Sequence, residues 1–315
     1  MSRADAQPLG DLSLIPLGTS AAIPAHGRHL TAHALDLGPT WILFDCGEGA
    51  QYQILKTDLR PSRLSTICIT HLHGDHVFGL PGLLTSLSMA GREEPLTIIG
   101  PEGLFAPLLA WPGVQGTSFE IVPVAIADDL THAIVLETES YNMEVRPLDH
   151  RVFCAGYRWQ EKSGAGNLDV EKARALGVTD WRDYRRLKAG EAIEADGRTI
   201  NPDDVLIPPP PPRSLAFVTD TAPCEGGRLL SQSASLVVHD STFATAYEAR
   251  AAQTGHSTSA QAAQVARDAG AHALLLTHFS ARYETTDELE AQASEVFVAS
   301  TAAVELEPIR IDLQR

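Results

Sequence analysis

Six consecutive residues, His71-Leu-His73-Gly-Asp75-His76, combine three imidazoles and one carboxylate. They follow an apolar run, Ile67-Cys-Ile-Thr70, that is typical of a buried strand. If the extended chain continues through the motif, His71, His73 and Asp75 share one side of it, and a strand end is a rigid platform for ligands. Nitrogen and carboxylate ligands at this density suit zinc or a similar metal. The motif therefore predicts a metal centre.

Three further candidate ligands stand in a similar context, because His150, Asp220 and His278 each follow a β-like run. The carboxyl ends of strands are where α/β sheets build their sites. Taken singly, each could be an ordinary surface group. With the four residues of the first motif they make seven potential ligands, which is more than one four-coordinate metal can use. Two metals that share one carboxylate would use all seven.

The elements that must position these residues can be read from the pattern of apolar residues. Short apolar runs predict buried strands, for example at Leu12–Leu17, Trp41–Asp45, Thr66–Thr70, Thr97–Ile99, Phe119–Val124, Leu215–Val218, Leu236–Val238 and Ala273–Leu276. Helical patterns cover Val77–Met89, Ser257–Ala269 and Asp287–Ala299. Strands that alternate with helices indicate an α/β fold.

Residues 156–213 differ in composition from the rest of the chain. They are polar and of mixed charge, and they end in five consecutive prolines, Pro208–Pro212, which favour extended chain. We expect one domain over residues 1–315 with an inserted, protruding arm at 156–213. An ordinary surface excursion is the alternative.

The overall charge limits the partners that the chain can take. The sequence has 315 residues, 44% of them hydrophobic, and a formal charge of -16. This charge argues against a protein whose whole surface binds nucleic acid without selectivity. Residues 151–200 nevertheless hold ten basic and eight acidic residues, so they carry +2 and leave −18 on the remainder. The densest basic cluster is Arg182, Arg185, Arg186 and Lys188. It could contact several phosphates, with a solvated helix face as the alternative.

The start of the chain is polar, and no long apolar run follows it. The four cysteines are far apart in sequence and show no CxxC spacing, which favours reduced thiols. We therefore expect a cytoplasmic protein that does not engage a membrane.

Several motifs carry a resemblance to a known family. In addition to His71–His76 they are Leu17-Gly-Thr-Ser-Ala-Ala-Ile-Pro24, Phe44-Asp-Cys-Gly-Glu-Gly-Ala-Gln51, His239-Asp-Ser-Thr-Phe243, Gly255-His-Ser-Thr258 and Thr277-His-Phe-Ser-Ala-Arg-Tyr283. The sequence resembles the metallo-β-lactamase superfamily and, within it, the tRNase Z (ribonuclease Z) family. The resemblance implies an αββα metallo-β-lactamase sandwich with the site between its two sheets.

The resemblance also implies a ligand assignment. It places His71, His73 and His150 on one zinc, places Asp75, His76 and His278 on the other, and makes Asp220 the bridge. Each subunit would then hold two Zn²⁺, with Mn²⁺ or Co²⁺ as possible substitutes.

The activity that the resemblance implies is removal of 3′ trailers from precursor tRNA. A hydroxide that bridges the metals would hydrolyse one phosphodiester and leave a tRNA 3′-hydroxyl. In the family the inserted arm grips the tRNA elbow, and we expect a homodimer in which one subunit's arm holds tRNA cut by the other. The alternatives are a small-molecule hydrolase of the same fold, such as a phosphodiesterase or lactonase, and an inactive tRNA-binding protein.

Further roles are carried over from the matching motifs. His256 is the candidate general acid with Asp240 as its orienting carboxylate, and Asp75 could double as a base. Ser280 and Arg282 could bind the scissile phosphate. Asp45 and Glu48 would support the metals, or serve only as turn residues.

Two departures from the family pattern carry expectations of their own. The family's usual glutamate is Asp240 here, so we expect a longer or water-mediated link to His256. Gly177–Asp183 replaces the usual Gly-Pro-rich arm tip, so docking of the elbow could differ.

Overall fold

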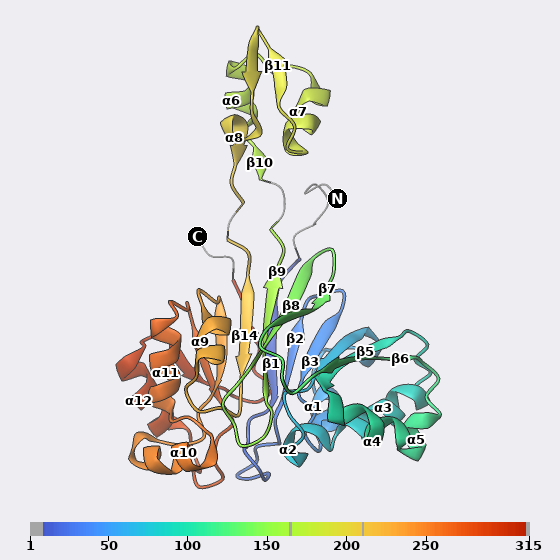
Figure 1. Cartoon of the computed structure of the whole chain (residues 1–315), viewed down its shortest axis with the longest axis vertical. Helices are drawn as coiled ribbons and strands as arrows, with labels where there is room; N and C mark the ends of the chain where they lie inside the picture. Colours follow the sequence, from blue (N-terminus) through green and yellow to red (C-terminus); the bar gives the residue numbers. More distant parts are fainter. Residues whose placement is uncertain (1–8, 164–165, 210, 313–315) are drawn as a thin grey trace.

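The structure is a computed structural model that describes residues 9–163, 166–209 and 211–312. Two seven-stranded sheets pack face to face, with helices on the outer side of each (Figure 1). The first sheet has the order β18 (Ile309–Arg310), β1 (Ser13–Gly18), β2 (Ala32–Asp36), β3 (Trp41–Phe44), β4 (Leu64–Cys68), β5 (Leu96–Pro101) and β6 (Ile121–Ile126). The second has the order β17 (Ser300–Ala302), β16 (Leu274–Thr277), β15 (Leu236–Asp240), β14 (Ser214–Val218), β9 (Ala155–Glu161), β8 (Tyr141–Pro147) and β7 (Ala133–Glu137). The expected αββα sandwich is confirmed.

The main core lies between the sheets. Phe44 of β3 stacks on Phe217 of β14 with ring centroids 4.9 Å apart, and Tyr157 of β9 packs beside Phe44. A second cluster joins the outer face of the first sheet to its helices. Burial on both faces explains why the central strands are apolar throughout rather than alternating.

The helices that cover the first sheet are α1 (Ala50–Ile54), α3 (Leu80–Met89), α4 (Phe105–Ala110) and α5 (Pro112–Gln115). The helices on the side of the second sheet are α9 (Glu225–Ser231), α10 (Glu248–Thr254), α11 (Ser259–Asp268) and α12 (Asp287–Val296). None of the helices in the described part of the chain has the length and apolar character of a membrane span.

The helix expected at Val77–Met89 is divided in two. A short helix, α2 (Gly74–Val77), precedes α3, and Phe78 and Gly79 separate them. A Cβ on Gly79 would lie 2.3 Å from the carbonyl oxygen of Gly47, so the chain must approach another loop closely at this point. Only glycine permits that approach.

Strand direction gathers the candidate ligands at one edge of the sandwich. Strands β3 to β6 run parallel to one another, as do β14 to β17. Strand β8 also runs parallel to β14, because β9 is antiparallel to both. The carboxyl ends of β4, β8, β14 and β16 therefore present the residues that follow them at a common edge.

The arm leaves the sandwich between β9 and β14 and projects beyond the end of the sheets (Figure 1). It contains β10 (Asn167–Leu168), α6 (Val170–Ala175), α7 (Trp181–Lys188), β11 (Ile193–Ala195), β12 (Arg198–Ile200), α8 (Pro202–Val205) and β13 (Leu206–Ile207). These elements enclose a small core of their own, built on Ala173, Val178, Leu187, Ile193, Ile200 and Val205.

The boundary expected for the arm is corrected at its start. Residues 156–161 pair along β8 and β14 within the second sheet, so the arm begins after Glu161. Their aromatic and apolar side chains face the core, which a composition count over the whole segment conceals. The proline run that closes the arm includes residue 210, which lies outside the described residues.

A buried ion pair ties the two ends of the arm together. Glu161 accepts from Arg213 at 2.7 Å, and both side chains are almost fully buried. Arg213 also donates to the carbonyl oxygens of Leu9 and Gly10. A charge-assisted network of this kind holds the root of the arm in one arrangement.

Candidate metal centre

The candidate ligands converge in two groups. The ligand atoms of His71, His73, His150 and Asp220 lie within 4.8 Å of one another, and so do those of Asp75, His76 and His278. Asp220 has one oxygen toward each group. Its Oδ2 is 3.7 Å from Nε2 of His71, and its Oδ1 is 3.1 Å from Nε2 of His278. This is the arrangement that a carboxylate shared by two ions requires.

The chain does not stay extended through the first motif. His71 and His73 lie on extended chain after β4 and do meet, with Nε2 of His71 2.8 Å from Nδ1 of His73. Asp75 belongs instead to the first turn of α2, so the expectation that it shares their side is wrong. The helical turn that begins at Gly74 brings Asp75 and His76 close to His278, with which they form the second group.

The buried polar atoms in this centre fit metal ions. Within the described chain, Nε2 of His76, His150 and His278 and Oδ1 of Asp220 are buried and have no hydrogen-bond partner. Buried polar atoms are nearly always paired, so four orphans at one point indicate a missing partner. The other ring nitrogen is engaged in each case: Nδ1 of His76 donates to Asp45 at 2.7 Å, and Nδ1 of His150 donates to the carbonyl of Gly255 at 2.8 Å. Each of these rings therefore turns Nε2 toward the centre. Burial would lower the pKa of His76, but Asp220 and Asp45 raise it well above its usual value, so a metal that binds this ring would displace its proton.

The other charge states that are shifted suit the same ions directly. Burial holds the pKa of His71 well below its usual value and also lowers the pKa of His150, so both are neutral, as ligands must be. Burial would raise the pKa of Asp220, but His278 and His76 hold it well below its usual range. Asp220 is therefore a carboxylate. The same two histidines outweigh burial and lower the pKa of Asp75.

Three residues at the centre have left-handed backbone, with φ of 57° at Asp45, 57° at Asp220 and 61° at His278. Such a conformation costs about 1–3 kcal/mol for a residue other than glycine, and it concentrates at functional sites. Asp45 and His278 directly follow β3 and β16, and Asp220 follows β14 after one residue, so all three turns lie at strand ends.

The candidate acid and its partner are in direct contact. His256 Nδ1 lies 2.7 Å from Oδ2 of Asp240, so the expected longer or water-mediated link is wrong. The shorter aspartate reaches because Phe243 bonds through its backbone to Ser257 and Ser259, which draws the His256 loop against the end of β15. Burial alone would lower the pKa of His256, but Asp240 raises it to about 9.

A cleft of about 800 Å³ opens onto the centre. Ser280 and Arg282, the candidates for binding the phosphate, line it, and the Arg282 guanidinium lies 4.2 Å from the ring centroid of Tyr247. Arg151 and Arg250 also line the cleft and are exposed. Sequence reasoning missed these two arginines as site residues. Arg151 adjoins the ligand His150, which is a usable signal, whereas Arg250 lies in an alanine-rich helix that carries none.

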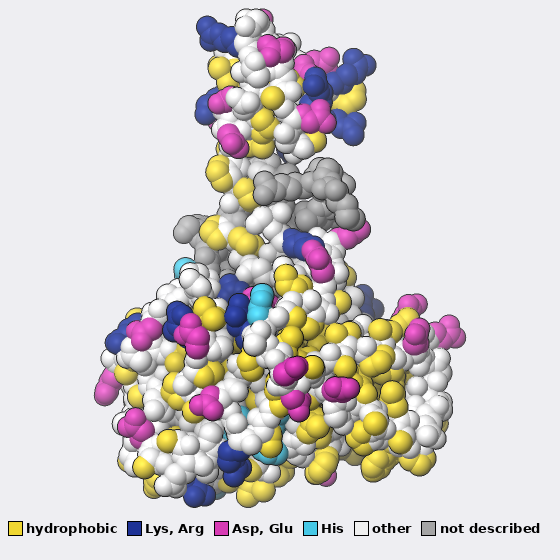
Figure 2. All heavy atoms as spheres, in the orientation of Figure 1, with side chains coloured by type: hydrophobic (Ala, Val, Ile, Leu, Met, Phe, Trp, Pro, Cys, Tyr) yellow, Lys and Arg dark blue, Asp and Glu magenta, His cyan; other side chains and the backbone are white. Residues whose placement is uncertain are grey.

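The predicted arm residues lie away from this cleft, on α7. Arg182 and Arg185 lie 5.5 and 5.8 Å from the centroid of the exposed Trp181 ring. Arg186 pairs with Asp183 and Glu191, while Lys188 is exposed. Lys and Arg side chains stand beside acidic ones on the surface of the arm (Figure 2). The structure therefore does not bring these four residues to the metal centre.

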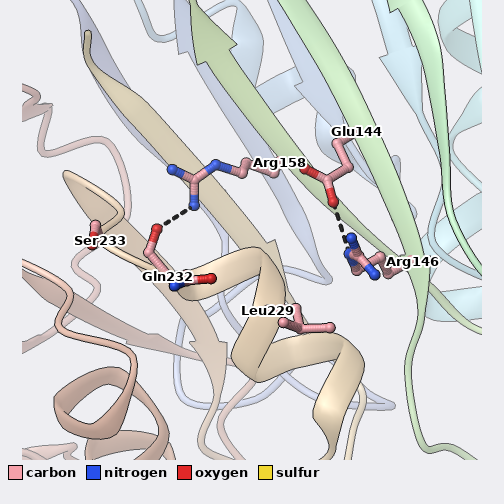
Figure 3. A pocket seen from close by; sticks show the side chains of 6 residues that line it. All are labelled: Glu144, Arg146, Arg158, Leu229, Gln232 and Ser233. Atoms are coloured by element: carbon pink, nitrogen blue, oxygen red, sulfur yellow. Dashed lines mark hydrogen bonds and ion pairs between the residues drawn. The ribbon is translucent and has the colours of Figure 1, made fainter. Parts of the chain in front are cut away.

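A second hollow lies beside α9, lined by Glu144, Arg146, Arg158, Leu229, Gln232 and Ser233 (Figure 3). Arg158 donates to the carbonyls of Leu230 and Gln232 and so caps the end of α9, while Arg146 pairs with Glu144 at 2.7 Å. These charges are satisfied within the fold, so the hollow is a structural feature.

The sandwich and its edge cluster of histidines and aspartates define a hydrolase scaffold of the metallo-β-lactamase class, and residues 35–139 match the family model "Metallo-beta-lactamase superfamily". The chain is 45% identical to ribonuclease Z of Salinibacter ruber (strain DSM 13855 / M31) over 96% of its own length and 95% of that protein. It is 42% identical to ribonuclease Z of Bacillus thuringiensis (strain Al Hakam) over 96% and 100%. The chain therefore belongs to the ribonuclease Z family, and the expected resemblance is confirmed.

Solved structures agree with this assignment. Human tRNase Z, short form, superposes with a TM-score of 0.69 at 26% identity, covering 96% of this chain and 100% of that one. A long-form RNase Z from yeast gives the same TM-score at 14% identity, covering 96% of this chain and 41% of the yeast chain. The yeast structure bears on the fold alone.

Proposed function

We propose that this chain is a metal-dependent endoribonuclease that removes 3′ trailers from precursor tRNA and leaves a tRNA 3′-hydroxyl. The observation that carries the proposal is the position of His256, paired with Asp240, in a chain of the ribonuclease Z family. His256 lines the same cleft as four of the seven candidate ligands, which are His73, Asp75, Asp220 and His278. Such an arrangement would bring a proton donor and a Lewis acid to the same substrate bond.

The proposed cofactor is a pair of Zn²⁺ ions, with Mn²⁺ or Co²⁺ as substitutes. His71, His73 and His150 would hold one ion, Asp75, His76 and His278 the other, and Asp220 both. When bound, the ions would activate the attacking water and neutralise charge that develops on the phosphate.

The other roles belong to side chains of this chain. Arg282 and Ser280 line the cleft beside the ligands, so they would bind and orient the scissile phosphate. His256 carries a proton at neutral pH because Asp240 raises its pKa to about 9, and it would donate that proton to the leaving 3′-oxygen. Asp75 stays ionised, so we propose it as a ligand that also accepts a hydrogen bond from the attacking water.

We further propose that the arm docks the tRNA elbow and that two subunits cooperate. The arm joins the body at the end of β9 and the start of β14, whereas Asp220 follows the other end of β14. The arm and the candidate ligands therefore lie at opposite ends of the same strands. A twofold dimer would bring one subunit's arm to tRNA bound at the centre of the other.

We place the protein in the cytoplasm, where such a substrate is made.

The decisive assay offers three substrates to the zinc-loaded protein: precursor tRNA with a 3′ trailer, bis-p-nitrophenyl phosphate and cyclic AMP. We expect one cut at the base of the trailer, yielding a tRNA 3′-hydroxyl and a 5′-phosphorylated trailer. Hydrolysis of the small diesters without any cut in precursor tRNA would contradict the proposal and favour a small-molecule phosphodiesterase.

Asp220 offers a test of the metal assignment. Asp220→Ala removes the one carboxylate that faces both groups, so metal content and cleavage rate should fall together, by at least about tenfold. Metal content is measured by atomic emission after dialysis. Asp129→Ala, at an exposed loop position, is the matched control and should change neither. An Asp220→Ala protein with full metal content and full rate would refute the bridging role.

A further inference from the structure

Two aspartate–threonine pairs support the centre, one from each sheet. In the first sheet, Thr70 Oγ1 lies 3.0 Å from both oxygens of Asp45 and 3.0 Å from Nδ1 of His71. In the second, Thr242 Oγ1 lies 2.7 Å from Oδ1 of Asp240 and 3.0 Å from Nδ1 of His278. His71 belongs to the first ligand group and His278 to the second.

The match between the two pairs extends to their other contacts. Each aspartate also accepts the backbone N–H of its own threonine, at 2.8 Å for Thr70 and 2.9 Å for Thr242. Each then uses an oxygen to accept Nδ1 of a second histidine at 2.7 Å, which is His76 for Asp45 and His256 for Asp240. The same network is reached by different chain paths, since Asp45 and Thr70 are 25 residues apart and Asp240 and Thr242 only two.

Hydrogen-bond polarity gives these contacts one consistent direction. A carboxylate can only accept hydrogen bonds, so each threonine hydroxyl must donate its single proton to the aspartate. The hydroxyl oxygen can then only accept from the neighbouring imidazole, which places the proton of that ring on Nδ1. Nε2 of each ring is then left as an acceptor that lies near Asp220. Nε2 of His278 has no hydrogen-bond partner among the described residues, and Nε2 of His71 lies 2.8 Å from Nδ1 of His73.

We propose that Thr70 and Thr242 are positioning residues that fix the tautomer and ring orientation of one histidine ligand in each group. Through them, Asp45 and Asp240 each align two histidines, one directly and one by way of the hydroxyl. The two halves differ in one respect: the second histidine is a ligand, His76, in the first half but the proposed acid, His256, in the second. Asp240 thus links a metal ligand to the proton donor. The inference about ligands rests on the proposed metal site, and only this last link rests on the proposed reaction.

Substitution separates this positioning role from a merely structural role of the threonines. Valine keeps the shape and the backbone N–H but loses the hydroxyl, whereas serine keeps the hydroxyl. Thr219 supplies a matched control, because its buried Oγ1 adjoins Asp220 but has no hydrogen-bond partner among the described residues. Thr219→Val removes a buried hydroxyl beside a ligand without touching either aspartate.

The test measures zinc affinity by chelator competition on folded, zinc-free protein, without substrate. We expect Thr70→Val and Thr242→Val to weaken zinc binding by about 10–100-fold, which is typical for loss of such a supporting bond. Thr70→Ser, Thr242→Ser and Thr219→Val should stay within about threefold of the parent protein. Valine variants that bind zinc as tightly as the parent, or serine variants that lose as much as valine, would overturn the proposal.

A second measurement does not depend on variants that fold. In ¹⁵N-detected NMR of the parent protein, His71 and His278 should carry their proton on Nδ1 in both the zinc-free and zinc-loaded forms. A proton on Nε2 of either ring in the zinc-free protein would also overturn the proposal. Because neither readout uses RNA, a failure to cleave precursor tRNA would contradict the proposed function and leave this inference standing.

Discussion

The His256–Asp240 contact links electrostatics to chemistry at the scale of single residues. Burial disfavours the imidazolium, but a carboxylate at 2.7 Å more than compensates, and the pKa of His256 rises to about 9. Because this pKa lies above the ordinary value of about 6.5, the pair stabilises the fold fully below pH about 6.5. That contribution is lost as pH rises through about 9. The proton that His256 would donate is therefore held across the neutral range.

Substitution of Asp240 should move the alkaline limb of the pH–rate profile. In the parent protein we expect cleavage to fall as pH rises through about 9, where His256 loses its proton. Asp240→Asn removes the charge, so the limb should shift down by about two pH units toward the ordinary histidine value. Asp240→Glu restores the carboxylate and should leave the limb near 9. A limb that stays in place in Asp240→Asn would show that another group controls it.

Single residues also mark how far prediction from sequence reaches. The ligands could be predicted because they stand close together in one motif, or directly after apolar runs that end at one sheet edge. Asp45, which contacts His76, could be named from its motif. Other supports could not, since Gly255 and Thr242 contact His150 and His278 across 105 and 36 residues. Such pairings depend on the packing of distant loops, which no local pattern records.

At the scale of elements, most predicted strands form within one or two residues of their expected bounds. Two errors arise where two elements meet. The helix expected at Val77–Met89 breaks at Gly79 because the loop at Gly47 passes so close. Likewise, the early arm boundary assigned residues 156–161 to the insertion because their pairing with β8 and β14 is not visible in composition.

Helix α7 is the element on which we expect tRNA docking to depend. Arg185→Glu combined with Arg186→Glu should weaken tRNA binding by at least about tenfold. The negative slope of log affinity against log salt should become shallower by about two, because two phosphate contacts are lost. Hydrolysis of bis-p-nitrophenyl phosphate should not change, because α7 lies outside the cleft. Filter binding over a salt series gives the first quantity.

The matched control for α7 uses the neighbouring helix of the arm. Lys172→Glu combined with Arg174→Glu alters two exposed basic residues of α6 and makes the same change in net charge. It should weaken binding much less. If both pairs weaken binding equally, the arm attracts tRNA only through its total charge and α7 has no special role.

At the scale of the whole molecule, the arm and the metal centre lie at opposite ends of β9 and β14 (Figure 1). This separation leads to a test of the proposed dimer. A subunit with Arg185→Glu and Arg186→Glu lacks the grip, and a subunit with Asp220→Ala lacks the centre. If one subunit's arm serves the other's centre, mixing equal amounts and allowing exchange should restore about a quarter of the parent rate.

The estimate of a quarter follows from counting. After exchange, half of the dimers are hybrids. Each hybrid has two pairings of an arm with the other subunit's centre, and only one of them joins an intact arm to an intact centre. Cleavage is measured on precursor tRNA before and after mixing. Each variant mixed with itself is the control and should stay inactive. No recovery in a mixture shown by native mass spectrometry to contain hybrids would mean that arm and centre act within one chain.

The same separation has a consequence for how such a molecule can change over time. The arm has its own small core and joins the body at two adjacent strand ends, beneath which Glu161 and Arg213 close the root. Mutations that reshape the arm therefore leave the strand ends that present the ligands untouched, and mutations at the ligand edge leave the arm intact. Substrate range and bond-breaking chemistry can be inherited and altered as separate traits, although one polypeptide encodes both.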